Sequence, residues 1–363
     1  MVANKLRLRG FRTASKTSPD DGGWRPVLCW LLCPLLVGGM AVGCLSRGER
    51  QVVVYAALDE DFSAPIFAEF TRETGIVVRA KYDTESTKTV QLTTEILAER
   101  ARPRCDLFWN NEILNTLRLA DEGLLRAYVP PTADDYPAEF RDREGRWHGF
   151  AARARVLIVN THLVAEDALP HSIAELAEPR WRGQVALAKP LFGTTRTHAV
   201  CLFQTWGEQR ARQFFRDVAG NAQILSGNKQ VAVAVARGQA AWGVTDTDDA
   251  IIELEKGLPV QIIYPDQGAG EMGTLFIPNT LAAIQGSPHQ LEANRLIDYL
   301  LTPAIEEQLA AGPGAQVPLH PAVQMALRVE TPRTIRPLRV DFPAAAKQWG
   351  EISKFLEQTF ARP

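Results

Sequence analysis

The chain has 363 residues, of which 46% are hydrophobic and 23% are charged, and its formal net charge is −2. This is the composition of an ordinary globular protein, and the length predicts two lobes rather than a single core. Because no dense basic stretch occurs beyond the N-terminus, the sequence argues against a nucleic-acid-binding protein.

The N-terminus has the layout of an export signal. Basic residues between Lys5 and Arg25 precede an apolar run over 27–42, which is short for a membrane span. The run closes on Ala-Val-Gly-Cys at 41–44, which resembles a bacterial lipobox with Ala41 where Leu is more usual. The resemblance implies a signal peptide over 1–43, lipidation of Cys44, a tether over 44–51, and a lipoprotein on the periplasmic or cell-surface side. An uncleaved anchor or an ordinary signal is the alternative.

Two cysteines remain after the predicted cleavage site, Cys105 and Cys201. Both lie in apolar surroundings, which favours two separate buried thiols, and a disulfide is the alternative.

Strands and helices are predicted to alternate along the mature chain. Runs rich in β-branched and aromatic residues predict strands at 52–55, 76–80, 106–109, 155–160, 184–188, 241–244, 260–264 and 274–277. Helices are expected between them: one ends at Gly75, one begins at Gly193, and others follow Pro288. This order predicts an α/β protein with mostly parallel sheets and flanking helices.

Polar residues gather where the predicted strands end. Open α/β sheets bind ligands beyond the carboxyl ends of their strands, so these residues predict a cleft between two lobes. They are Asp59, Thr84, Glu85, Ser86, Asn110, Gly193, Thr194, Thr195, Asp246, Asp248 and Asp249.

Five segments carry a family resemblance: Val-Val-Val-Tyr at 52–55, Phe-Thr-Arg-Glu-Thr-Gly-Ile at 70–76, Arg-Ala-Arg-Val-Leu-Ile-Val-Asn at 153–160, Pro-Arg-Trp-Arg-Gly-Gln-Val at 179–185 and Leu-Ile-Asp-Tyr-Leu-Leu-Thr-Pro at 296–303. Over 52–309 the chain resembles the extracellular solute-binding proteins of ABC importers, of the type that carries ferric iron. The resemblance implies the two-lobed periplasmic-binding-protein fold of type II. It implies one lobe from 52–152 plus 265–302 and another from 153–264 plus 303–363. It also implies a monomer that serves a permease and an ATPase.

The resemblance also implies a metal site with altered ligands. The His, Glu and Tyr-pair positions of the ferric members fall at Asp59, Glu85, Asp248 and Asp249, so only the Glu is kept. Oxygen ligands of this kind suit hard cations, and we expect a bound metal ion rather than a catalytic cofactor. Helix capping by these acids is the alternative.

An anion site is predicted beside the metal. The helix that begins at Gly193, with Thr194 and Thr195, offers N–H groups and a favourable dipole, and the resemblance places a synergistic anion there. Arg153 and Asn228 would supplement it, with Thr84, Ser86, Asn110 and Asp246 as further ligand-binding candidates, whereas Arg155 is interpreted as structural.

Other functions stay open at this point. The ligand could instead be an organic cation such as a polyamine, boxed by aromatic residues, or a phosphorylated or anionic solute. A lipid-anchored hydrolase is the alternative from another class, but no nucleophile elbow or His-Glu-x-x-His motif occurs, so we expect no enzyme. A sensor that passes ligand occupancy to a membrane partner also fits the sequence.

Overall fold

Ten strands form one hydrogen-bonded sheet, eight of them along a continuous path, in the computed structural model, which describes residues 49–83 and 90–360. Along the path the order is β2-β1-β3-β10-β5-β8-β6-β7, with β4 beside β10 and β9 beside β5. The bounds are β1 Gln51–Ala56, β2 Val77–Tyr82, β3 Leu107–Asn110, β4 Leu125–Arg126, β5 His148–Asn160, β6 Val185–Ala188, β7 Gln223–Leu225, β8 Trp242–Asp246, β9 Val260–Ile263 and β10 Phe276–Ile284. The predicted signal peptide, Cys44, Thr84, Glu85 and Ser86 lie outside the described residues.

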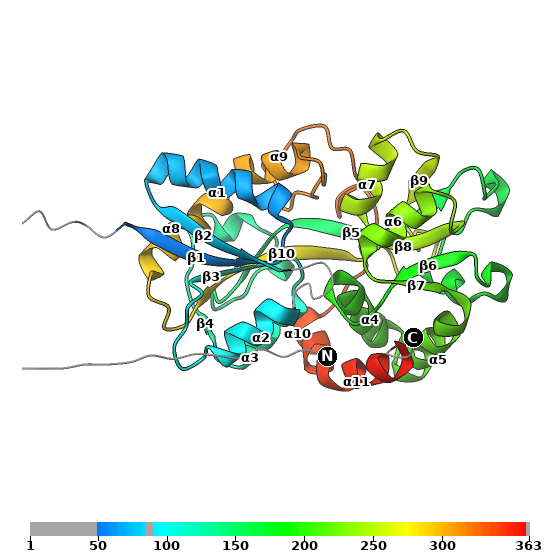
Figure 1. The fold of residues 1–363 in the computed structure, drawn as a ribbon, viewed down its shortest axis with the longest axis horizontal. Helices are drawn as coiled ribbons and strands as arrows, with labels where there is room; N and C mark the ends of the chain where they lie inside the picture. Colours follow the sequence, from blue (N-terminus) through cyan, green and yellow to red (C-terminus); the bar gives the residue numbers. More distant parts are fainter. Residues whose placement is uncertain (1–48, 84–89, 361–363) are drawn as a thin grey trace, which may run out of the picture. The chain divides into compact units, whose positions relative to one another are not determined.

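Strand β5 joins two groups of strands. Its residues 148–154 pair with β10, whereas residues 155–160 pair with β8 and β9. We call β1–β4 and β10 with their helices the first lobe, and β6–β9 with theirs the second lobe. Pairs β1–β2, β1–β3, β6–β7 and β6–β8 are parallel, and β5 and β10 run antiparallel to their neighbours across the centre of Figure 1. The α/β fold is thus as predicted, but the sheet is mixed rather than mostly parallel, because β5 and β10 are antiparallel to all of their neighbours. The lobe boundaries given above stay predictions.

Helices cover both groups of strands. Their bounds are α1 Glu60–Thr74, α2 Val90–Ala98, α3 Leu114–Asp121, α4 Gly193–Trp206, α5 Glu208–Asn221, α6 Asn228–Ala236, α7 Thr247–Glu255, α8 Gln290–Leu300, α9 Pro303–Ala311, α10 Phe342–Lys347 and α11 Trp349–Phe360. Helix α1 shows why they form: Ile66, Phe67 and Phe70 bury one face, and Gly75 ends the helix at φ +68°. None of the helices in the described ranges is long and apolar enough to span a membrane.

Two strands are longer than predicted. β5 begins at His148 rather than at 155, and β10 continues to Ile284 rather than ending at 277. The extra residues of β5 pair with β10, and those of β10 pair with β5, β3 and β4, so this tertiary pairing, rather than a local β-branched run, sets the length of both strands. Pro278 lies where the register of β10 shifts, which is where a strand tolerates proline.

The last two helices contact both lobes. Helix α10 packs against α3 of the first lobe and α4 of the second, and α11 packs against α4 and α5 (Figure 1). Cys105 and Cys201 are both buried and free, which confirms two separate thiols, and burial raises the pKa of each.

A candidate ligand pocket at the strand ends

A polar pocket lies where strands of both lobes end. Most of the site residues predicted from the sequence that the structure describes line it: Asp59, Arg153, Gly193, Thr194, Thr195, Asn228, Asp246, Asp248 and Asp249. Asn111, Ala188, Lys189, Phe192, Ser226 and Gly227 complete the lining. The prediction of one shared cleft therefore agrees with where these residues lie, although what they bind is a separate question.

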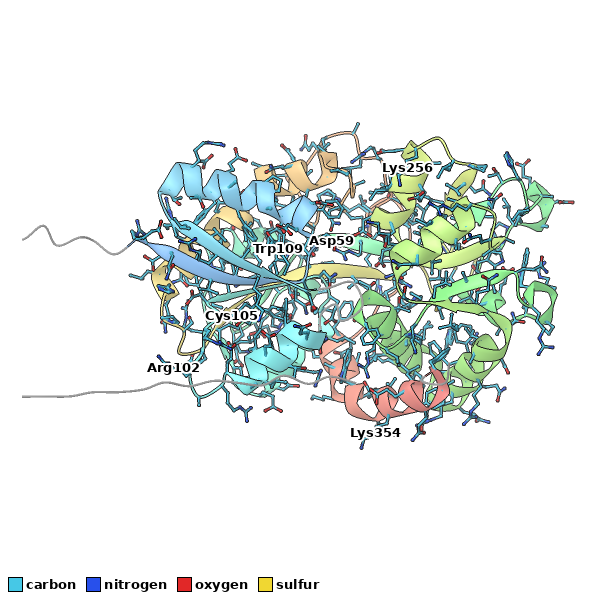
Figure 2. The ribbon with its side chains drawn as sticks, in the orientation of Figure 1. Asp59, Arg102, Cys105, Trp109, Lys256 and Lys354 are labelled. Atoms are coloured by element: carbon cyan, nitrogen blue, oxygen red, sulfur yellow. The ribbon has the colours of Figure 1, made fainter. Side chains whose placement is uncertain are left out.

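Strand ends and helix starts position the acids. Asp59 follows β1 and immediately precedes α1 (Figure 2), while Asp246 ends β8 and precedes α7. Neither side chain makes a capping hydrogen bond to its helix. Asp248 and Asp249 lie in the first turn of α7, where the helix dipole favours negative charge. A capping hydrogen bond therefore does not account for the positions of Asp59 and Asp246.

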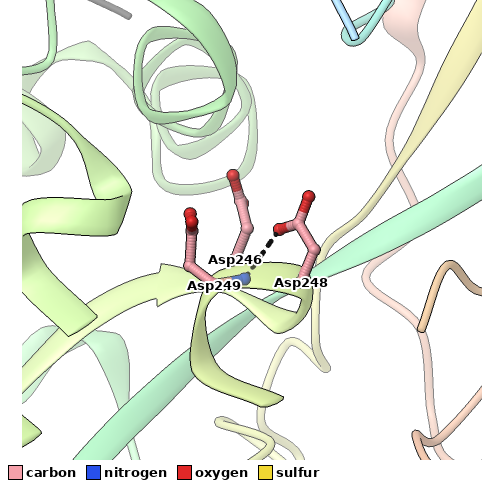
Figure 3. A group of neighbouring side chains, drawn as sticks. All are labelled: Asp246, Asp248 and Asp249. Carbon is pink, nitrogen blue, oxygen red and sulfur yellow. Dashed lines mark hydrogen bonds between the residues drawn. The ribbon is translucent and has the colours of Figure 1, made fainter. Parts of the chain in front are cut away.

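Asp246, Asp248 and Asp249 form a compact group, which we call the acid cluster. One carboxylate oxygen from each lies within 4.8 Å of the others, and Figure 3 shows the three side chains projecting from the same turn. The backbone N–H of Asp249 donates to Oδ1 of Asp248 at 3.1 Å. Such a grouping of oxygens can hold a cation, because like charges held this closely repel unless a positive group lies among them.

Asp246 is already engaged by protein donors. Its Oδ1 accepts a hydrogen bond from Nη1 of Arg155 at 2.7 Å, and its Oδ2 accepts from Thr194 and from Nδ2 of Asn228. Arg155 is fully buried, and its guanidinium also donates to Thr195 and to His198. These contacts tie β5, β8, α4 and α6 together, so Asp246 and Arg155 hold the pocket wall in place.

Arg153 brings positive charge into the pocket. Its Nε lies 3.5 Å from Oδ2 of Asp248, and its Nη2 donates to Asn279 at 3.3 Å. Burial alone would lower the pKa of this guanidinium, but the surrounding carboxylates, Asp248 foremost, raise the pKa above its ordinary value. The acid cluster is therefore partly neutralised by the protein itself.

Asn110 is not where the sequence reasoning put it. Its Nδ2 donates to Glu112 and to Thr116 within the first lobe, and it does not line the pocket. The next residue, Asn111, lines the pocket instead, with 2% of its surface exposed and no hydrogen-bond partner for Oδ1 among the described residues. Asn111 rather than Asn110 reaches the pocket because of where β3 ends. Asn110 is the last paired residue of that strand, and Asn111 is the first residue beyond it.

Three further lining residues were not predicted from the sequence, namely Lys189, Ser226 and Gly227. Lys189 follows β6 directly, and Ser226 and Gly227 follow β7, so they obey the rule that revealed the other residues. Lys189 could be predicted because it directly follows a strand that the sequence predicts. Strand β7 is only three residues long, and its local composition does not predict a strand.

Strand ends from both lobes that meet at one polar pocket define a two-lobed binding protein. Residues 107–342 match the family of bacterial extracellular solute-binding proteins, and the chain belongs to that family. It is 23% identical over 292 residues to the major ferric iron-binding protein of Neisseria meningitidis serogroup A, covering 77% of this chain and 84% of that one.

Solved structures show the fold. Iron-bound HitA from Pseudomonas aeruginosa superposes with a TM-score of 0.77 at 23% identity, over 85% of this chain and 99% of that chain. The periplasmic binding protein AfuA from Actinobacillus pleuropneumoniae, with fructose-6-phosphate bound, gives 0.77 at 17% identity over 87% and 100%. These likenesses confirm the two-lobed periplasmic-binding-protein fold.

Proposed function

We propose that this protein is the solute-binding subunit of an ABC importer and that it captures a hard metal ion with a companion anion. The observation that carries the proposal is that Asp59 of the first lobe and the acid cluster of the second line one pocket. Carboxylate oxygens are the ligands that hard cations prefer. Ligands from both lobes also couple binding to lobe closure, because only the closed form brings them together. The ferric iron named for the Neisseria relative and for HitA supports an iron-like ion.

Asp59, Asp248 and Asp249 are the proposed metal ligands, and Glu85, which lies outside the described residues, is the proposed fourth. Asp246 belongs to the pocket wall rather than to the metal, since both of its oxygens accept protein hydrogen bonds. The metal would replace the partial neutralisation that Arg153 supplies in its absence.

The companion anion is proposed to sit at the start of α4. Gly193 adopts φ +51°, and Thr194 and Thr195 follow in the first turn, where backbone N–H groups and the helix dipole favour negative charge. Lys189 and Arg153 line the same pocket and add positive charge. Thr84 and Ser86 remain proposed contacts.

A phosphorylated organic solute is the second candidate. Arg153 lies in contact with Asp248, so the pocket offers positive charge beside negative charge, which suits a ligand with an anionic head and donor groups. The sugar phosphate in the AfuA structure supports this candidate. An organic cation such as a polyamine is less well supported, because Tyr55, Trp109 and Trp242 are buried in the core rather than lining the pocket.

The cellular setting is proposed from the sequence and the relatives. Cys44 would carry a lipid anchor on the periplasmic or cell-surface side, and a permease and an ATPase would receive the solute from a monomeric binding protein. We propose binding without catalysis, because the relatives are named as binding and uptake proteins.

Native mass spectrometry with elemental analysis of the protein purified from its own host tests ligand and anchor together. We expect one equivalent of metal, an added anion, and a chain that begins at a lipidated Cys44. An added mass that matches a phosphorylated organic molecule without metal would favour the second candidate. Retention of residues 1–43, or an unmodified residue 44, would contradict the anchor.

A further inference from the structure

A buried side-chain hydrogen bond connects the two lobes close to residues that line the pocket. The hydroxyl of Thr197, in α4 of the second lobe, donates to Oε2 of Glu112, which lies between β3 and α3 of the first lobe, at 2.7 Å. The two residues are 85 positions apart in the chain, and both are fully buried.

The carboxylate of Glu112 is fixed within the first lobe. It accepts the backbone N–H groups of Leu114 at 2.7 Å and Asn115 at 3.0 Å, which are the unpaired donors at the start of α3. It also accepts from Nδ2 of Asn110 at 3.0 Å. Because these contacts come from one lobe, Glu112 keeps its position and three of its donors when the lobes separate. The contact with Thr197 is the one that separation would break.

This contact adjoins both walls of the pocket. Asn111, next to Glu112, lines the pocket from the first lobe, and Thr195, two residues before Thr197, lines it from the second. The length of the hydrogen bond therefore sets how near the start of α4 lies to the end of β3. A hydrogen bond to a buried carboxylate is among the stronger polar contacts in proteins, so it biases this spacing.

We infer that Glu112 and Thr197 are a positioning pair that latches the lobes in the closed, ligand-holding arrangement. The inference rests on the proposed function only in that closure retains a solute. The hydrogen bond favours the closed arrangement whether or not a solute is bound, so it slows the release of a bound solute. Neither residue needs to touch the solute.

The test compares Thr197→Val, which removes the hydroxyl and keeps the shape, with Thr197→Ser, which keeps the hydroxyl. Thr274→Val is the matched control, because Thr274 is also fully buried and its hydroxyl donates to the backbone O of Pro265 at 2.8 Å, away from the pocket. Ferric iron with inorganic phosphate is the probe, and stopped-flow release into a chelator gives the dissociation rate. Small-angle scattering of the metal-free protein gives the compactness of each variant.

Thr197→Val should release iron roughly tenfold faster, the scale of one charged hydrogen bond, and its association rate should be no lower than that of wild type. Its metal-free form should have a larger radius of gyration than wild type. Thr197→Ser and Thr274→Val should match wild type in both measurements.

Equal release rates and equal radii for Thr197→Val and Thr274→Val would overturn the latch, as would a lower thermal midpoint for Thr197→Val with unchanged release. If the wild-type protein binds neither iron nor phosphate, the proposed metal function fails. The metal-free scattering comparison then still decides the latch by itself.

Discussion

His198 is held in its neutral form beside a buried cation. It is 4% exposed, and its Nδ1 accepts a hydrogen bond from Nε of Arg155 at 3.3 Å. Burial, and then the charge of Arg155, lower the pKa of His198 well below its ordinary value. The unfolded chain therefore takes up a proton as the pH falls below about 6.5 while the folded protein does not, so this residue stabilises the fold above that pH and the contribution is lost as the pH falls.

Urea unfolding at pH 7.5 and 5.5 measures this loss. The wild-type protein should lose about 1 kcal/mol more than His198→Gln over that range, since one group contributes at most about 1.4 kcal/mol per pH unit. His148, whose pKa burial also lowers, titrates equally in both proteins and cancels from the difference. Equal losses in the two proteins would contradict the assignment.

At the residue scale, the sequence predicts well which polar residues lie together in the pocket, but it predicts poorly which partner each of them contacts. Asp59, Thr194 and Asp248 were identified because they follow strands, and they line the pocket. The distinction between Asn110 and Asn111 depends on the last paired residue of β3, and strand ends are uncertain by more than one residue from pattern alone. The engagement of Asp246 by Arg155 joins residues 91 positions apart, which no local pattern reports.

At the scale of elements, the C-terminal helices are fastened to both lobes by Trp349. Its ring makes cation–π contacts with the guanidinium groups of Arg118 in α3, 5.0 Å from the ring centroid, and of Arg196 in α4, at 4.6 Å. Trp349 is 6% exposed, and Arg196 also pairs with Glu357 of α11 at 3.0 Å. Removing the ring takes away both cation–π contacts and leaves a cavity.

Trp349→Ala should lower the free energy of unfolding by about 3–5 kcal/mol, the usual cost of truncating a buried tryptophan. Trp206→Ala is the comparison, because Trp206 is half-buried and stacks against Arg210 alone among the described cations, so its loss should be smaller. Denaturant unfolding measures both. A loss below about 1 kcal/mol for Trp349→Ala would mean that α10 and α11 are not held at this point.

Element prediction succeeded where local patterning decides and failed where pairing does. The strands at 52–55 and 185–188 were found because their β-branched and apolar runs are complete in themselves. The first half of β5 contains Gly149, Ala151 and Ala152, which have no strand preference, and it is a strand because β10 pairs with it.

At the scale of the whole molecule, length and alternating elements were enough to predict two lobes with a cleft between them. They were not enough to predict that α10 contacts both lobes, because helices at the end of a chain pack wherever an apolar surface is available. The choice of ligand also lies beyond the fold, since related two-lobed structures hold iron in one case and a sugar phosphate in the other.

The central claim, that Asp59 of the first lobe and Asp248 and Asp249 of the second bind one hard cation, is tested most directly by calorimetric titration of ferric and divalent metal ions in phosphate buffer. Wild type should bind one ion, and Asp59→Asn and Asp248→Asn should each weaken binding by about 1–3 kcal/mol, the scale of losing a charged ligand. The metal-free thermal midpoint of Asp59→Asn should be unchanged or raised, because the substitution relieves repulsion among the acids. That of Asp248→Asn should be lowered, because the substitution removes the counter-charge of the buried Arg153. Intact affinity with a lowered metal-free midpoint in both variants would contradict the claim and make these residues supports of the fold.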